Sequence, residues 1–299
     1  MRVAVLIMWL LHWLPLPILA RLGESIGSFL YLVMGRRRHI CLTNLRLCFP
    51  HMSERERKQI TRRHFQVYVR SVLERGILWW SSETRLRKLI HVEYAMPMAT
   101  MISSPTIFMC PHFVSLDVAG VAVMLESSLC SIYTTQRNKH FDKALRQGRS
   151  RFRPVKLFSR AEGVKPIIRA MKENLPFFML PDMDFGRKDA EFVSFFGVPA
   201  ATLTALPRIA AATHAKVIPV IASIRPGYDG WDVKFDQAWS DYPHSDIVSA
   251  TRHMNAYIET EILKMPAEYF WTHRRFKTRP AGEASVYKKS KKAFEDTQH

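Results

Sequence analysis

Residues 106–117, TIFMCPHFVSLD, form the stretch that decides how the whole chain is interpreted. Its first four residues are an apolar run that predicts a short buried strand, and Pro111 interrupts the chain directly behind it. Folds of the α/β class place their active sites beyond the carboxyl ends of such strands. The polar residues His112 and Asp117 therefore stand where chemistry is expected.

His112 and Asp117 are candidates for a catalytic pair. Residues five apart on a regular helix point about 140° away from each other, so these side chains can meet only across a turn or a helix start. If they meet, Asp117 can accept one imidazole N–H and stabilise the imidazolium that forms when His112 takes a proton. The alternative is a capped helix start with a structural histidine, because this spacing is common by chance.

Strand-like and helix-like segments alternate on both sides of this stretch. Strands are predicted at 106–109, 129–135, 176–180 and 216–223, with an edge strand at 231–237. Helices are predicted from an N-cap at Ser53 to about Trp80, and at 119–125, 141–152, 165–173, 203–213 and 247–263. The alternation predicts an α/β fold with a mixed, largely parallel sheet flanked by helices.

The N-terminus reads as a membrane anchor. Residues 3–20 carry no formal charge, and as a helix they would span about 27 Å, enough for a thin bilayer. A cleaved signal peptide would end in small residues, and a core helix this apolar would need complete burial. The arginine triplet at 36–38 then places the remainder of the chain on the cytoplasmic side, which predicts a single-pass topology with an N-terminal transmembrane helix. The predicted divisions are an anchor at 1–35, a folded domain at 36–280 and a basic tail at 281–299 whose composition favours disorder.

The chain is strongly basic, with a formal net charge of +18 over 299 residues. This charge predicts an anionic partner, namely nucleic acid, an acidic protein or anionic lipid. Nine bases stand against one acid, Asp142, in a single cluster: Arg137, Lys139, Lys143, Arg146, Arg149, Arg151, Arg153, Lys156 and Arg160. Forked guanidinium groups suit phosphates, and a basic face suits an acidic carrier protein or nucleic acid. No recognised nucleic-acid module accompanies the cluster.

Two further acids, Asp182 and Asp184, leave the predicted strand at 176–180 in a turn that contains Gly186. Ion pairing to Arg149 or Arg160 is the favoured interpretation, because no third metal ligand is obvious. The four cysteines include no CxxC pair, which favours free thiols in a reducing compartment.

The His112–Asp117 segment, the segment with Arg160, the segment with Asp182 and the apolar segment at 217–220 occur in the order found in the lysophospholipid acyltransferase superfamily, which the chain resembles. The more specific resemblance is to the late (lauroyl/myristoyl) acyltransferases of lipid A biosynthesis, and it runs nearly end to end. Asp182 stands where a Glu-Gly pair is usual in the wider superfamily. The segments that carry the resemblance are 36–38, 44–45, 48–50, 111–117, 146–149, 157–160, 180–186, 195–200, 217–220 and 271–277.

The resemblance implies an acyltransferase domain anchored to the bacterial inner membrane and facing the cytoplasm. It would move a fatty acyl chain from acyl carrier protein to a hydroxyl of a 3-hydroxyacyl chain on a lipid A precursor, without metal, organic cofactor or nucleic acid. His112 would be the general base oriented by Asp117, and Arg149, Arg160, Asp182 and Asp184 would bind substrate. Two alternatives stay open: an O-acyltransferase for a phospholipid or ornithine lipid, and a non-catalytic membrane-bound protein that binds anionic lipid or nucleic acid.

Overall fold

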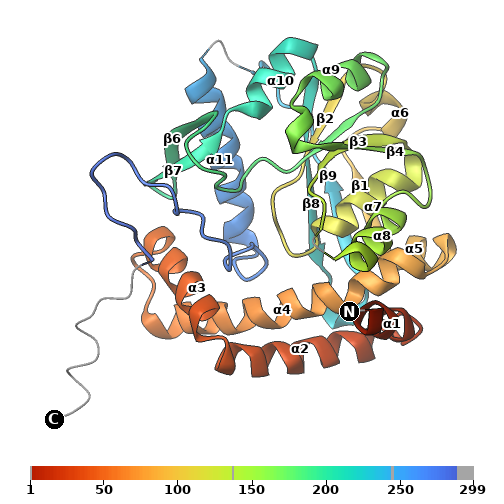
Figure 1. The fold of residues 1–299 in the computed structure, drawn as a ribbon, viewed down its shortest axis with the longest axis vertical. Helices are drawn as coiled ribbons and strands as arrows, with labels where there is room; N and C mark the ends of the chain where they lie inside the picture. The colour runs from red at the N-terminus through yellow and green to blue at the C-terminus, as the bar shows by residue number, and fades with distance from the viewer. Residues whose placement is uncertain (1, 137, 244–245, 288–299) are drawn as a thin grey trace.

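A computed structural model describes residues 2–136, 138–243 and 246–287 (Figure 1). The chain begins with four consecutive helices: α1 (Arg2–Leu11), α2 (Leu16–Val33), α3 (Gly35–Cys48) and α4 (Glu54–Trp80). The predicted start of α4 is confirmed, because Ser53 and Glu56 cap it reciprocally in a capping box. In Figure 1 these helices form a layer below the rest of the molecule, with α2 running alongside α4.

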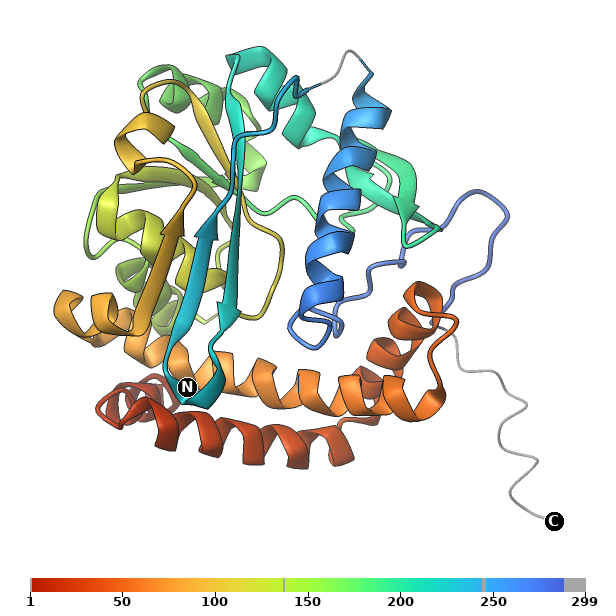
Figure 2. The same ribbon diagram turned by 180° about the vertical axis from the view of Figure 1, so that it is seen from behind.

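A seven-stranded sheet in the order β1-β9-β8-β2-β5-β3-β4 lies above this layer. Among the described strand pairs of this seven-stranded sheet, β8 with β9 alone is antiparallel, so the predicted mixed, largely parallel sheet is confirmed. The predicted edge strand at 231–237 was wrong in its position, because β1 pairs with its outer side (Figure 2). The strands are β1 (Ile90–Tyr94), β2 (Thr106–Met109), β3 (Leu129–Tyr133), β4 (Val155–Ser159), β5 (Phe177–Met179), β8 (Lys216–Ile224) and β9 (Trp231–Phe235).

Helices cover both faces of the sheet, and the antiparallel hairpin β6 (Ala190–Phe195) and β7 (Val198–Leu203) stands beside α11. The helices that follow α4 are α5 (Glu83–Leu89), α6 (Met98–Met101), α7 (Leu116–Glu126), α8 (Lys139–Gly148), α9 (Lys165–Lys172), α10 (Ala205–Thr213) and α11 (Ile247–Lys264), with 3-10 turns η1 (Arg160–Glu162) and η2 (Pro226–Tyr228).

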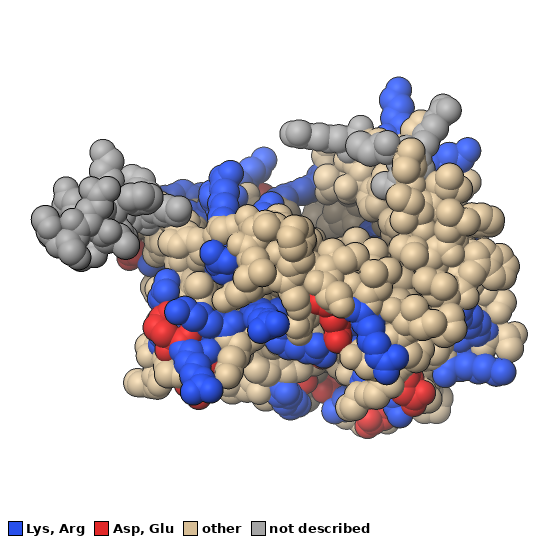
Figure 3. Space-filling model, turned by 90° about the horizontal axis from the view of Figure 1, so that it is seen from below, with Lys and Arg blue, Asp and Glu red and all other residues tan. Residues whose placement is uncertain are grey.

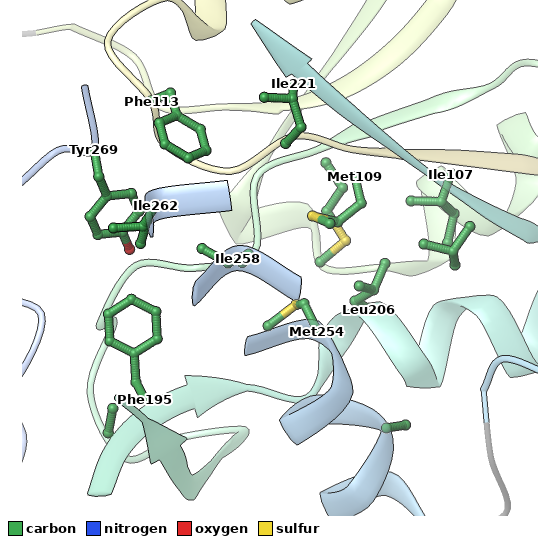
Figure 4. Packing of buried hydrophobic residues seen from close by; sticks show 14 of the residues in the cluster. Ile107, Met109, Phe113, Phe195, Leu206, Ile221, Met254, Ile258, Ile262 and Tyr269 are labelled. Carbon is green, nitrogen blue, oxygen red and sulfur yellow. The ribbon is translucent and has the colours of Figure 1, made fainter. Parts of the chain in front are cut away.

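The central strand β2 separates two hydrophobic cores because its side chains alternate between the faces of the sheet. Ile107 and Met109 join the core formed with α9, α10 and α11, where Met109 lies between Leu206 and Met254 (Figure 4). Phe108 joins the core formed with α4, α5 and α7. Since β2 is buried on both faces, its carboxyl end is fixed from both sides.

The predicted anchor at residues 3–20 is divided between α1 and α2. Pro15 is the N-cap residue of α2, which begins at Leu16, and because proline lacks a backbone N–H the chain cannot run through it as one continuous helix. One described helix, α2, is long and apolar enough to cross a membrane. Gly23 and Gly27 bring α2 against the backbone of α4: a Cβ on Gly23 would lie 2.6 Å from the Cα of Arg70.

Residues 281–287 of the predicted tail are described, and residues 288–299 lie outside the described part. Tyr287 is buried, and its hydroxyl donates to Asn44 Oδ1 (2.6 Å). All four cysteines are free and buried, as predicted from the absence of a CxxC pair.

Candidate active site

The candidate site lies at the carboxyl ends of the parallel strands. His112 follows β2, Asp182 follows β5 and Arg160 follows β4. Because β2 and β5 are neighbouring parallel strands, their ends meet at one edge of the sheet. The topology thereby joins two blocks that are 70 residues apart in the sequence.

His112 is held by Asp182 in two ways. Its Nδ1 lies 2.7 Å from Asp182 Oδ1, and its backbone N–H points to both carboxylate oxygens at 3.2 and 3.1 Å. Burial alone would raise the pKa of Asp182, which is fully buried, but its interaction with His112 outweighs burial and holds that pKa below its ordinary value.

The tautomer of His112 is set by this contact. An ionised carboxylate can only accept hydrogen bonds, so Nδ1 must donate its proton to Asp182. In the neutral ring Nε2 is then left as an acceptor, and within the described residues it has no hydrogen-bond partner. His112 is therefore set as a base with a free lone pair.

Asp117, in the first turn of α7, has other partners. Its Oδ2 accepts from Arg75 Nε (2.8 Å) and its Oδ1 accepts from Arg149 Nη2 (2.6 Å). Burial would raise the pKa of Asp117, but the charges of Arg149 and Arg75 outweigh it and lower the pKa to about 2. The expectation that Asp117 orients the imidazole by accepting a hydrogen bond from a ring N–H was wrong, because Asp182 accepts the hydrogen bond from Nδ1 of His112.

The predicted pairing of Asp182 or Asp184 with Arg149 or Arg160 was also wrong. Asp184 accepts from the backbone N–H and the hydroxyl of Thr278 (2.6 and 2.8 Å), so it secures a loop. Arg160 lies over the ring of Phe185, with its guanidinium carbon 4.0 Å from the ring centroid. The strand order explains both results. β3 lies between β5, which precedes the two aspartates, and β4, which precedes Arg160. Arg149 instead pairs with Asp117 on α7.

A late segment, residues 266–279, closes over the site. The carbonyl of His112 accepts from the Phe270 N–H (3.0 Å), and the Val114 N–H donates to the Glu268 carbonyl (2.8 Å). His273 Nε2 accepts from the Asp184 N–H (3.2 Å), and burial lowers the pKa of His273 to about 4. This histidine is therefore neutral at pH 7.

Arg75 and His273 are site residues that we did not single out from the sequence. Arg75 belongs to the helix predicted from the N-cap at Ser53 to about Trp80, in which no site residue was predicted. The one sequence signal that could have identified Arg75 is its position beside the apolar residues that end this helix. His273 lies in the segment 271–277, which carried the family resemblance without a role for this residue.

A cavity of about 450 Å³ opens beside His112. His112, Asp117, Arg149 and Arg160 all line it, together with mostly apolar side chains from α4, α7, α8 and β3. It extends along α7 as far as Met124 and reaches Leu129 at the start of β3. The charged groups thus border an elongated apolar space. Within the described residues, no group of three or more His, Cys, Asp or Glu side chains is placed to hold a metal ion.

Comparisons with known proteins agree with one another. The family model "Bacterial lipid A biosynthesis acyltransferase" matches residues 2–278. The lipid A biosynthesis palmitoleoyltransferase of Escherichia coli K12 is 32% identical over 284 residues, which cover 94% of this chain and 92% of the relative. The lauroyltransferase of the same organism is 29% identical over 94% of this chain and 92% of its own length. The myristoyltransferase is 29% identical over 91% of this chain and 84% of its own length.

Proposed function

The chain belongs to the bacterial lipid A biosynthesis acyltransferase family, and on that premise we propose the reaction that its site performs. The protein is an acyltransferase. It moves a fatty acyl chain from acyl carrier protein to a hydroxyl of a 3-hydroxyacyl chain on a lipid A precursor. The observation that carries this proposal is His112, whose Nδ1 is held by buried Asp182 while the ring lines the cavity.

His112 acts as the general base. Its free Nε2 takes the proton from the acceptor hydroxyl while the hydroxyl oxygen attacks the thioester carbonyl carbon. The tetrahedral intermediate collapses, the C–S bond breaks, and the imidazolium returns the proton to the departing thiolate. Asp182 stabilises the imidazolium between these steps and keeps Nε2 directed at the substrate, so no serine or cysteine nucleophile is required.

Asp117 contributes to the same site through the two arginines that it holds. Arg75 and Arg149 are long, flexible side chains that line the cavity, and the carboxylate they share fixes both guanidinium groups. Fixed guanidinium groups suit the phosphates of a lipid A precursor or negative charge that develops during transfer. Arg160 also lines the cavity and supplies a third cation. Asp184 supports this side of the site by securing Thr278.

The cavity receives the acyl chain of the donor. An apolar space beside the base holds a hydrocarbon chain out of water and leaves its carbonyl carbon at the polar end. The exposed basic side of α8, with Lys139, Lys143 and Arg146, lies next to this opening and suits an acidic carrier protein. We place the enzyme on the cytoplasmic face of the inner membrane, where carrier and acceptor meet.

The test supplies purified protein with carrier loaded with chains of several lengths and an under-acylated lipid A precursor, and reads products by mass spectrometry. A mass gain of one acyl chain is expected, and it should be lost in His112→Ala. His51→Ala, which changes an exposed histidine outside the site, should keep full activity.

Three other results would count against the proposal. Retained transfer in folded His112→Ala would remove the base from the mechanism. Transfer to a lysophospholipid or ornithine lipid, with none to the lipid A precursor, would change the acceptor. Tight, salt-sensitive binding of anionic lipid without acyl transfer would indicate a lipid-binding protein instead of an enzyme.

A further inference from the structure

Large apolar side chains are exposed mainly at the N-terminus. Thirteen of the twenty exposed large hydrophobic residues in the described part of the chain lie between Val3 and Met34. They include Trp13, which is 68% exposed, and Phe29, which is 61% exposed. An apolar patch of this size marks a contact with another apolar phase rather than with water.

The opposite side of α2 is fixed to the domain. The glycines at 23 and 27 place its backbone directly on α4, where a Cβ on Gly27 would lie 2.5 Å from the Phe65 carbonyl oxygen. Glu24 accepts from Arg63 (2.9 Å) and from the Tyr228 hydroxyl (2.9 Å). The helix is therefore joined both to α4 and to η2 at the tip of the β8–β9 hairpin.

The turn between α1 and α2 is fixed as well. Arg85 of α5 donates to the carbonyls of His12 (2.6 Å) and Leu14 (2.7 Å), which belong to the turn between α1 and α2. In addition, α1 packs against α4 where Gly76 leaves room for the Met8 carbonyl. A spanning helix would have to leave α4 and give up these contacts, since α4 itself is rich in charged residues.

Basic side chains flank the apolar patch. Arg36 and Arg37 are exposed directly after α2, and Arg62 and Arg63 are exposed on α4. Figure 3, which views this side of the molecule, shows a largely uncharged surface interrupted by many Lys and Arg side chains and fewer acidic ones. An apolar helix side bordered by cations suits the headgroup and acyl boundary of an anionic leaflet.

We propose that α1 and α2 lie in the plane of the membrane and dock the enzyme on one leaflet, in place of the single spanning helix expected from the sequence. The occupant of this surface is an anionic phospholipid bilayer. The opposite side of α4 lines the cavity with Tyr68, Ser71 and Arg75. Packed helices are about 10 Å apart, so the cavity then opens one helix above the lipid headgroups. This arrangement does not depend on which acceptor is used.

The deciding experiment links α2 to α4 in membranes prepared from cells that express the chain. Gln66 Nε2 donates to Ser28 Oγ (2.9 Å), so these positions face each other. A Ser28→Cys/Gln66→Cys variant treated with a short bis-maleimide should crosslink within the chain, which is read by mass spectrometry of the peptides. The control is Phe29→Cys/Gln66→Cys, because Phe29 is the next residue but points outward. The four native cysteines are buried, which keeps the background low.

Each outcome of the crosslinking decides the proposal. A high yield for the first pair and a low yield for the control in membranes supports helices that lie in the plane. Crosslinking in detergent but not in membranes means that α2 leaves α4 to span the bilayer, and overturns it. No crosslinking in either condition, or equal yields for both pairs, would mean that α2 has no fixed side facing α4. Either result also overturns the proposal.

A second measurement tests the surface itself, with purified protein and vesicles of phosphatidylcholine with or without phosphatidylglycerol. Binding should be stronger to the anionic vesicles and should weaken with added salt. Leu22→Asp/Phe29→Asp should lower the bound fraction at least about tenfold, because two large apolar side chains lose burial. Val248→Asp, which changes an exposed apolar residue on α11, should bind as the wild type does. Unchanged binding of the double variant would exclude this surface.

Discussion

The carboxyl edge of the sheet and the N-terminal helical layer depart from ordinary globular structure in opposite ways. The edge buries charge, with Asp182 fully inaccessible and Asp117 nearly so. The N-terminal layer exposes apolar side chains, of which Trp13 and Phe29 are the most accessible aromatic examples. Soluble domains usually do neither unless the residues have a partner.

The two regions differ in where the partners of their unusual side chains come from. The buried charges are paired within the chain, so the edge is preorganised before any substrate arrives. The apolar patch has no cover within the described part of the chain, so it is completed from outside. Damage at the edge should therefore affect chemistry, whereas damage in the helical layer should affect stability and membrane docking.

The largest expected effect comes from Asp182→Asn, which tests the edge. An amide can still accept from the His112 backbone, but it no longer stabilises an imidazolium or fixes the tautomer. We expect kcat to fall about a thousandfold with little change in KM, by analogy with loss of the orienting carboxylate in a catalytic triad. Steady-state kinetics across pH should also show an altered profile, which a purely structural role would not produce.

Asp117→Asn is the matched comparison for this variant. It keeps the Nδ1 contact of His112 but loses the ion pairs with Arg75 and Arg149, so it should raise KM more than it lowers kcat. If Asp117→Asn lowered kcat more than Asp182→Asn, the orienting role would return to Asp117.

A smaller effect is expected from pH, through His64 on α4, between the two regions. His64 is fully buried and donates from Nδ1 to the Ala267 carbonyl (2.9 Å), and burial lowers its pKa to about 4. An unfolded histidine has a pKa of about 6.5, so below that pH the unfolded chain binds a proton that the folded chain lacks.

The stabilising contribution of neutral His64 is therefore complete above about pH 6.5 and is lost as pH falls to about 4. This difference corresponds to about 3 kcal/mol of unfolding free energy. Denaturant midpoints measured from pH 7 to pH 4 should fall less steeply in His64→Gln, which keeps an N–H donor. Identical slopes for both proteins would mean that His64 takes up no proton on unfolding.

The smallest effect is expected from Gly27→Ala, which tests the helical layer. The new methyl group would meet the backbone of α4 at 2.5 Å, so α2 must shift. Overpacking of this kind costs about 2 kcal/mol, and the gain in helix propensity offsets part of it. Thermal unfolding in detergent measures the change. Gly35→Ala, with open space around its Cβ, should be neutral, and equal stability of both variants would contradict close docking.

Much of the fold could be predicted from the sequence because its apolar runs are short and clearly bounded. The predicted strand at 106–109 coincides with β2, and the strands predicted at 129–135, 176–180 and 216–223 contain or overlap β3, β5 and β8. Strand order could not be predicted, because it depends on which helices pack on which face. No strand was predicted at 90–94, where β1 lies, and the edge position was therefore assigned to 231–237.

The site was predicted less completely than the fold. The strand end at His112 was located correctly, since a polar residue after a buried strand is a local signal. Its partner was not, because the spacing between His112 and Asp117 is local whereas Asp182 arrives through the pairing of β2 with β5. Arg75 was missed because helical periodicity assigns a face to a residue but not a partner on another element.

The contacts of residues 268–270 with the His112 loop have a consequence for biosynthesis. All seven strands of the main sheet are complete by Phe235, yet the His112 carbonyl and the Val114 N–H find their partners only at Phe270 and Glu268. A nascent chain that emerges from the ribosome therefore carries the strands long before the loop that bears the base is tied down. A chain that ends between Phe235 and Glu268 would therefore carry every strand of the main sheet but lack both partners that hold the His112 loop.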